Sequence, residues 1–169
     1  ESVPYQIKYL TELESFSAVG NSNAFTKKIV LGPEITTLKN LKSLSLMGYG
    51  ISEFPPEMKN MTQLEELDMN GNNFLKLPMD ILKGMTGLKY LNFGGNRVSG
   101  SVLNLQTDIP KKYTLETIGM GGNLPKEIFE MDNLEYLYLS YNYFYGSIPD
   151  MGYIGGVGKH NIMPNLKML

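Results

Sequence analysis

The residues of this chain that could carry chemistry are few. One segment holds Asp150, the pair Gly158-Lys159 and His160, the single histidine. A phosphate-binding loop needs a glycine five positions before Gly158 and a Ser or Thr after the lysine, but Tyr153 and His160 occupy these places. One carboxylate and one histidine are also too few for a calcium or transition-metal site. We therefore expect no nucleotide site and no metal site in this segment.

A second group is the adjacent pair Glu65 and Glu66. The two acids fall on neighbouring positions of an expected strand, where they solvate the sheet rather than act as acid and base. The chain has no cysteine, which excludes disulfides, thiolate metal sites and a cysteine nucleophile. A single histidine gives no convincing Ser-His-Asp set. The sequence predicts a protein that is not an enzyme and needs no cofactor.

The elements around these residues follow from a repeated phrase, L-x-x-L-x-L-x-x-N-x-φ, in which φ is a large apolar residue. A repeat of this kind cannot bury its apolar side alone and must stack on copies of itself. The copies start near residues 13, 41, 64, 88, 115 and 134, and a truncated copy starts at 166. Most of the spacings between these starts match the 20 to 29 residues of a leucine-rich repeat.

Each repeat predicts a strand followed by a short helical turn. The alternation in L-x-L indicates a strand with one buried face. The following P-x-x-φ-x-x-φ pattern, which begins at Pro33, Pro55, Pro78 and Pro125, fits a short 3-10 or α turn. The fold class is therefore α/β: a leucine-rich-repeat solenoid in a horseshoe arc, with a parallel sheet on the concave face and short turns on the convex face.

The asparagine of the phrase stands where the chain leaves the strand. Its amide can both donate and accept hydrogen bonds at this corner. Stacking predicts a structural ladder of Asn21, Asn72, Asn96, Asn123 and Asn142. Tyr49 replaces the asparagine of the second copy, so we expect a local irregularity there. The residue before the asparagine is glycine in five copies and Tyr141 in the sixth, which suggests a positive φ or a close approach.

Residues 1–169 are expected to form one domain, and two spacings do not fit the array. The repeat from 115 to 133 is short; either its corner is truncated or residues are missing near 123–124, and we favour missing residues. The abrupt stop after Leu169 leads us to expect a fragment of a longer array. The long repeat after Leu134 carries an insertion at 150–160, either a tolerated surface loop or part of a binding face.

The strand positions between the leucines face the concave side, the surface that such solenoids use for binding. This surface changes from small and polar near the N-terminus to aromatic near the C-terminus. Tyrosine pairs a rigid apolar ring with a polar tip and suits glycans and proteins alike, although strand propensity and packing alone also favour it. The candidate binding residues are Glu66, Asp68, Tyr90, Asn92, Tyr136, Tyr138 and Tyr141.

The overall composition limits the classes of partner that we expect. A net charge of −2 gives no reason to expect nucleic acid or an anionic membrane as a partner. No apolar run approaches the length of a membrane-spanning helix, so any membrane attachment would use an anchor outside this chain.

The repeats resemble the leucine-rich-repeat superfamily over most of the chain. The motif G-S-I-P at 146–149 is similar to the plant-type subclass, but the paired cysteines of plant receptor ectodomains are absent. The Gly-Gly-Asn and Asn-Gly-Asn corners and the Tyr-, Met- and Lys-rich composition resemble bacterial cell-surface lipoproteins of the Bacteroidota type. That resemblance implies an extracellular location on the outer membrane.

The same resemblance implies a non-catalytic binding module, serving as an accessory lipoprotein of a SusCD-like nutrient-uptake complex. Its partners would be outer-membrane transporter subunits, with a glycan or peptide as ligand. The alternative is a receptor ectodomain or adhesin that binds a host or signalling protein. A purely structural scaffold is a third interpretation.

Overall fold

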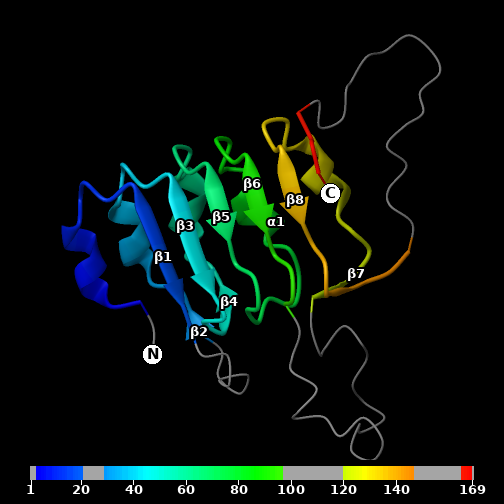
Figure 1. Cartoon of the computed structure of the whole chain (residues 1–169), viewed down its shortest axis with the longest axis horizontal. Coiled ribbons are helices and arrows are strands. Elements are labelled where there is room, and N and C mark those ends of the chain that lie inside the picture. Colours follow the sequence, from blue (N-terminus) through cyan, green and yellow to red (C-terminus); the bar gives the residue numbers. More distant parts are fainter. Residues whose placement is uncertain (1–2, 21–28, 97–119, 147–164, 169) are drawn as a thin grey trace, which may run out of the picture.

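The chain is described by a computed structural model that covers residues 3–20, 29–96, 120–146 and 165–168. Five parallel strands form the main sheet in the order β1-β3-β5-β6-β8. Their bounds are β1 Ser15–Val19, β3 Ser43–Met47, β5 Glu66–Asp68, β6 Tyr90–Asn92 and β8 Tyr136–Tyr138. Figure 1 shows these strands side by side, with the short helices behind them. The predicted solenoid with a parallel sheet is confirmed.

The rest of each repeat supplies a short second strand or a short helix. The second strands pair as β2 Ile29–Val30 with β4 Ile51–Glu53, and as β7 Gly121–Gly122 with β9 Tyr143–Phe144. Among the described residues, the 3-10 helices are η1 Tyr5–Tyr9, η3 Pro33–Thr37, η4 Pro56–Asn60 and η6 Lys126–Glu130, and the α-helix is α1 Met79–Leu82. The 3-10 turns confirm the convex layer that the proline pattern predicted.

Proline fixes where these convex turns begin. Pro33 is the first residue of η3, while Pro55, Pro78 and Pro125 are the N-cap residues of η4, α1 and η6. A proline costs little there, because the first N–H groups of a helix have no partner within the helix.

The core lies between the sheet and these turns. Strands β3, β5, β6 and β8 each turn a leucine inward, and Leu44, Leu67, Leu91 and Leu137 are all 0% exposed. Deeper in the arc, the ring of Phe74 lies 4.9 Å from that of Phe54 and 5.1 Å from that of Phe93, measured between centroids. Because each repeat adds one side chain to each of these rows, the core runs continuously along the stack.

Buried asparagines tie each repeat to the one before it. Asn72 donates from Nδ2 to the carbonyl of Leu46 at 2.8 Å and accepts from the N–H of Ile51 at 3.0 Å. Asn96 likewise donates to the carbonyl of Met69 and accepts from the N–H of Phe74. Both asparagines are 0% exposed, so these bonds satisfy backbone groups that water cannot reach.

The last member of this ladder shows how the repeats are stacked. Asn142 donates to the carbonyl of Phe93 at 2.8 Å and accepts from the N–H of Asn96 at 2.8 Å. Strands β6 and β8 are direct neighbours, with Tyr90 opposite Tyr136. A repeat that starts at 115 was expected to supply a strand of its own between them, but the direct pairing of β6 with β8 leaves no place for one.

Residues 120–133 instead complete the repeat that begins at Leu88. The N–H of Met120 donates to the carbonyl of Asn96, and η6 follows as the convex turn. The expected ladder included Asn123, but Asn123 is exposed and is not one of the buried asparagines. Its place in the stack is taken by Asn142. Asn21 lies outside the described residues.

The corner before the asparagine position has a left-handed backbone in several repeats. Gly48, Gly71 and Gly95 have φ between 66° and 68°, and Tyr141 has φ of 59° in the equivalent place. Gly20 differs: a Cβ there would lie 2.4 Å from the carbonyl oxygen of Gly48, so the close approach of the next repeat requires glycine. Tyr141 is the only non-glycine residue with positive φ in the described part of the chain.

Candidate functional site

The register of the sheet arranges the outward side chains in two rows across the concave face. The first row is Ser15, Ser43, Glu66, Tyr90 and Tyr136. The second row is Ser17, Ser45, Asp68, Asn92 and Tyr138. The direct pairing of β6 with β8 brings all the tyrosines of these rows onto adjacent strands. Six of the seven predicted binding residues therefore lie within three neighbouring strands.

The tyrosines form an aromatic cluster. The ring of Tyr90 lies 5.4 Å from that of Tyr138 and 6.4 Å from that of Tyr136, between centroids. These separations lie within the range of favourable ring contacts. Tyr138 donates from its hydroxyl to the sulfur of Met168, in the short segment that bridges to β8. The three rings thus form one half-buried surface at the C-terminal end of the sheet.

A polar network joins this aromatic cluster to the acids of β5. The amide of Asn92 donates to Asp68 at 3.3 Å and to the hydroxyl of Tyr90 at 3.4 Å. Asp68 also accepts from the N–H of Asn70, and Glu66 accepts from the hydroxyl of Ser43 at 2.8 Å. Burial raises the pKa of Tyr90, and the charge of Asp68 raises it further, so this phenol stays protonated at neutral pH.

Tyr141 stands apart from the cluster, at the corner after β8. Its side chain is 72% exposed. At this corner the backbone has the expected positive φ, but the residue is a large aromatic one where the preceding repeats carry glycine. Tyr141 therefore lies at the edge of the concave face.

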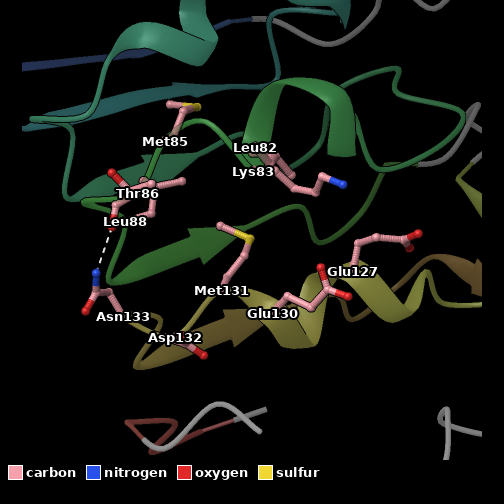
Figure 2. A pocket seen from close by; sticks show the side chains of 10 residues that line it. All are labelled: Leu82, Lys83, Met85, Thr86, Leu88, Glu127, Glu130, Met131, Asp132 and Asn133. Atoms are coloured by element: carbon pink, nitrogen blue, oxygen red, sulfur yellow. Dashed lines mark hydrogen bonds between the residues drawn. The ribbon is translucent and has the colours of Figure 1, made fainter.

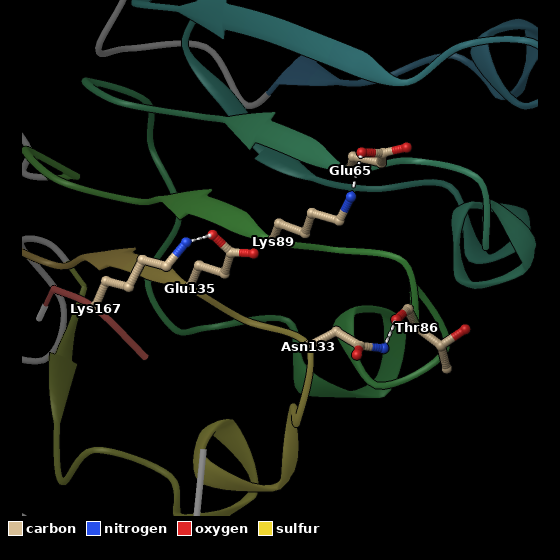
Figure 3. Close-up of polar contacts among 6 residues, drawn as sticks. All are labelled: Glu65, Thr86, Lys89, Asn133, Glu135 and Lys167. Carbon is tan, nitrogen blue, oxygen red and sulfur yellow. Dashed lines mark hydrogen bonds and ion pairs between the residues drawn. The ribbon is translucent and has the colours of Figure 1, made fainter. Parts of the chain in front are cut away.

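A column of alternating charge borders the concave face on the side where the strands begin. Its members are Glu14, Lys42, Glu65, Lys89, Glu135 and Lys167, and each one after Glu14 donates its N–H to the carbonyl of the one before. Lys89 pairs with Glu65 at 2.7 Å, and Lys167 pairs with Glu135 (Figure 3). Lys89 lowers the pKa of Glu65, and Glu65 raises the pKa of Lys89. This column was not predicted from the sequence.

The convex layer holds a cavity that was not predicted either. It has a volume of about 310 Å³ and lies between α1 and η6 (Figure 2). Met85 and Met131 contribute to its apolar lining, while Glu127 and Glu130 bring carboxylates to it. Asn133 donates to the carbonyl of Thr86 beside it at 2.9 Å. This cavity lies on the opposite side of the sheet from the tyrosine cluster.

The described residues contain no group of three or more histidine, cysteine or acidic side chains that could hold a metal ion. In the same part of the chain, no helix is both long and apolar enough to cross a membrane. The insertion at 150–160, with His160, lies outside the described residues.

Comparison with known proteins identifies the repeats. The model of the family "Leucine Rich Repeat" matches residues 63–85 and 133–152. A receptor-like protein of Arabidopsis thaliana, number 53, is 29% identical over 149 residues, which cover 86% of this chain and 15% of that protein. The adenylate cyclase of Schizosaccharomyces pombe is 31% identical over 109 residues, 61% of this chain and 6% of that enzyme. The chain thus spans less than a fifth of either relative.

Solved structures share the fold. An internalin from Listeria monocytogenes aligns over 99% of this chain and 37% of its own, with a TM-score of 0.63 and 18% identity. The ectodomain of the receptor kinase GASSHO1/SCHENGEN3 from Arabidopsis thaliana, solved in complex with CASPARIAN STRIP INTEGRITY FACTOR 2, aligns over 99% of this chain and 19% of its own. Its TM-score is 0.57 at 18% identity.

Proposed function

From the leucine-rich-repeat fold of this chain, we propose that it is a non-catalytic binding module that holds a protein or peptide on its concave face. The observation that carries the proposal is the contact of Tyr90 with Tyr136 and Tyr138 on adjacent strands. Clustered aromatic side chains dominate the energy of many protein interfaces. Here the cluster is supported by a rigid sheet, which lowers the entropy lost on binding.

The relatives favour a receptor or adhesin at the cell surface. One is a receptor-like protein, and one structural neighbour is a receptor ectodomain solved with its bound factor. These matches support an extracellular module whose ligand is itself a protein or peptide. Because the chain spans only a small part of each relative, a receptor or adhesin role for the whole protein is likewise a proposal.

A narrower version of the proposal places the chain on a bacterial outer membrane as a lipoprotein beside a nutrient transporter, with a glycan or peptide as ligand. It rests on the Tyr-, Met- and Lys-rich composition and on the glycine-asparagine corners. The receptor-like relative and the receptor ectodomain support the receptor or adhesin version instead. The match to the fission-yeast adenylate cyclase spans 6% of that enzyme and brings no cyclase activity to this chain.

Substitution of two aromatic residues of the concave face and its edge tests the proposal. Native membranes would be probed with the wild-type chain and with a Tyr138→Ala, Tyr141→Ala variant, and the captured proteins would be identified by mass spectrometry. A protein held through the concave face is lost from the variant. Tyr9→Ala is the matched control, because Tyr9 is 68% exposed on η1, away from the sheet face. Equal capture by wild type and double variant would refute the proposed binding face.

A further inference from the structure

We propose that the ligand presents a cationic side chain, arginine or lysine, to Glu66 and Asp68, and that this side chain lies against the rings of Tyr90 and Tyr138. The inference rests on the proposed function and specifies the chemistry of its partner. It follows from the distribution of charge on the concave face, from the neighbouring rings and from a cation that the chain already places on the same cluster.

The carboxylates on β5 and the one just before it differ in whether a cation pairs with them. Glu65, at the border of the concave face, is paired with Lys89. Within the described part of the chain, Glu66 and Asp68 accept hydrogen bonds only from neutral groups and have no ion pair. The lysines nearest in sequence register, Lys42 and Lys89, belong to the charge column rather than to the two inner rows. Among the described residues, the inner rows therefore carry two negative charges without a matching cation.

The tyrosine cluster lies within one or two strands of these carboxylates. Glu66 is directly opposite Tyr90, and Asp68 is opposite Asn92, which is in turn opposite Tyr138. Adjacent strands lie about 4.8 Å apart, and two residues along a strand span about 6.6 Å. A guanidinium or ammonium group above Asn92 would thus reach a carboxylate on one side and an aromatic face on the other. Both contacts favour a cation.

The cluster already accepts one cation on its outer side. The ammonium of Lys167 lies 5.7 Å from the centroid of the Tyr136 ring while pairing with Glu135. This arrangement of ring, ammonium and carboxylate is the one that we infer for the ligand on the inner side, where Tyr138 and Asp68 replace Tyr136 and Glu135. The inner side has the ring and the carboxylate, and the ligand supplies the cation.

The state of Tyr90 suits this role. Its raised pKa keeps the phenol neutral, so the ring adds no negative charge of its own and retains a proton to donate. Its oxygen accepts from Asn92, which fixes the hydroxyl beside Asp68. The carboxylates therefore set the charge preference, and the tyrosines provide contact area.

The test uses the complete chain and a random peptide library displayed on phage. Peptides selected on the wild-type chain would be synthesised with each arginine or lysine intact, and again with arginine replaced by citrulline and lysine by norleucine. We expect replacement of one such residue to weaken binding about ten-fold, which corresponds to about 1.4 kcal/mol. The Glu66→Gln, Asp68→Asn variant should bind the intact peptide as weakly as the wild type binds the neutral one.

A matched control separates this effect from net charge. Glu57→Gln, Asp80→Asn removes the same two charges from exposed positions on η4 and α1, and it should leave the affinity unchanged. Some peptides could lose affinity for the Tyr138→Ala variant and yet bind the wild type equally well after their arginine or lysine is replaced by citrulline or norleucine. Such peptides would overturn the cation inference and leave the proposed function standing. If the selected peptides are insensitive to Tyr138→Ala as well, the concave site itself is refuted.

Discussion

The ammonium of Lys89 lies 2.7 Å from the carboxylate of Glu65, and the next strand places Glu135 on its other side. Lys89 therefore stands between two acids in a column whose sign changes at every strand. Opposite charges on facing strand positions stabilise a sheet, whereas like charges destabilise it. The column favours the observed order of strands. An extra strand between β6 and β8 with an acid at this position would place that acid beside Glu135, a like charge.

Reversal of one charge in this column should destabilise the fold. Lys89→Glu would create three consecutive acids with Glu65 and Glu135. We expect a lower melting temperature in low salt, and a smaller difference from wild type in 1 M salt, where the screening length falls to about 3 Å. Lys76→Glu, at an exposed position outside the column, should have little effect. A salt-independent loss for Lys89→Glu would point to packing rather than charge.

The same pair predicts a pH dependence. The pKa of Glu65 is lowered by Lys89, so its contribution to stability is present above the ordinary value of 4.5 and is lost as the pH falls through the lowered pKa. The pKa of Lys89 is raised above its ordinary 10.5, so its contribution is present below that value and is lost at more alkaline pH. The difference in unfolding free energy between wild type and Lys89→Met should be largest between these limits. Urea titrations across the pH range would measure it.

The asparagine ladder predicts a contrast between two asparagines. Asn96→Ala would leave the buried carbonyl of Met69 and the N–H of Phe74 without their partner, while the carbonyl of Phe93 would keep the hydrogen bond from Asn142. Each unsatisfied group costs about 1–3 kcal/mol, so we expect a loss of at least about 2 kcal/mol. Asn123→Ala, at an exposed corner, should change stability by less than about 0.5 kcal/mol. Similar losses from both variants, measured by urea unfolding, would contradict the assignment of Asn123.

Tyr141 predicts a gain in stability. A non-glycine residue in the left-handed region costs about 1–2 kcal/mol, part of which is offset because glycine loses more entropy on folding. Tyr141→Gly should therefore stabilise the chain by about 0.5–1 kcal/mol in urea unfolding, while it weakens binding on the concave face. The reciprocal change Gly95→Ala, at φ of 66°, should destabilise it by about 1 kcal/mol. A less stable Tyr141→Gly variant would show that the tyrosine side chain contributes more to the fold than its backbone costs.

Much of the fold could be predicted from the residues themselves. The spacing of Leu64, Leu67 and Met69 indicates a strand with a buried side, and Pro55 and Pro125 mark the turns. These are local signals, and stacking turns them into one architecture. Positive φ at Gly48 and Gly71 could also be expected, because glycine adopts this backbone conformation without the steric cost that a Cβ imposes.

The order of the strands was harder to predict. Residues 115–123 match the repeat phrase locally, but the phrase does not say which copies share the sheet. That information lies in pairs that are distant in sequence, such as Asn142 with Phe93 and Asn133 with Thr86. The contact between the tyrosines of the candidate site could not be predicted for the same reason. The tyrosines of β6 and β8 become neighbours only when these strands pair.

The alternating charges also constrain how this array can change in evolution. Solenoids lengthen and shorten by duplication or loss of whole repeats. In this chain, insertion of one repeat beside Lys89 would place its own charge next to a like charge on one side, whichever sign it carries. Two repeats inserted together, one acidic and one basic at this position, would restore the pattern. We therefore expect natural variants of this array to differ in length by even numbers of repeats.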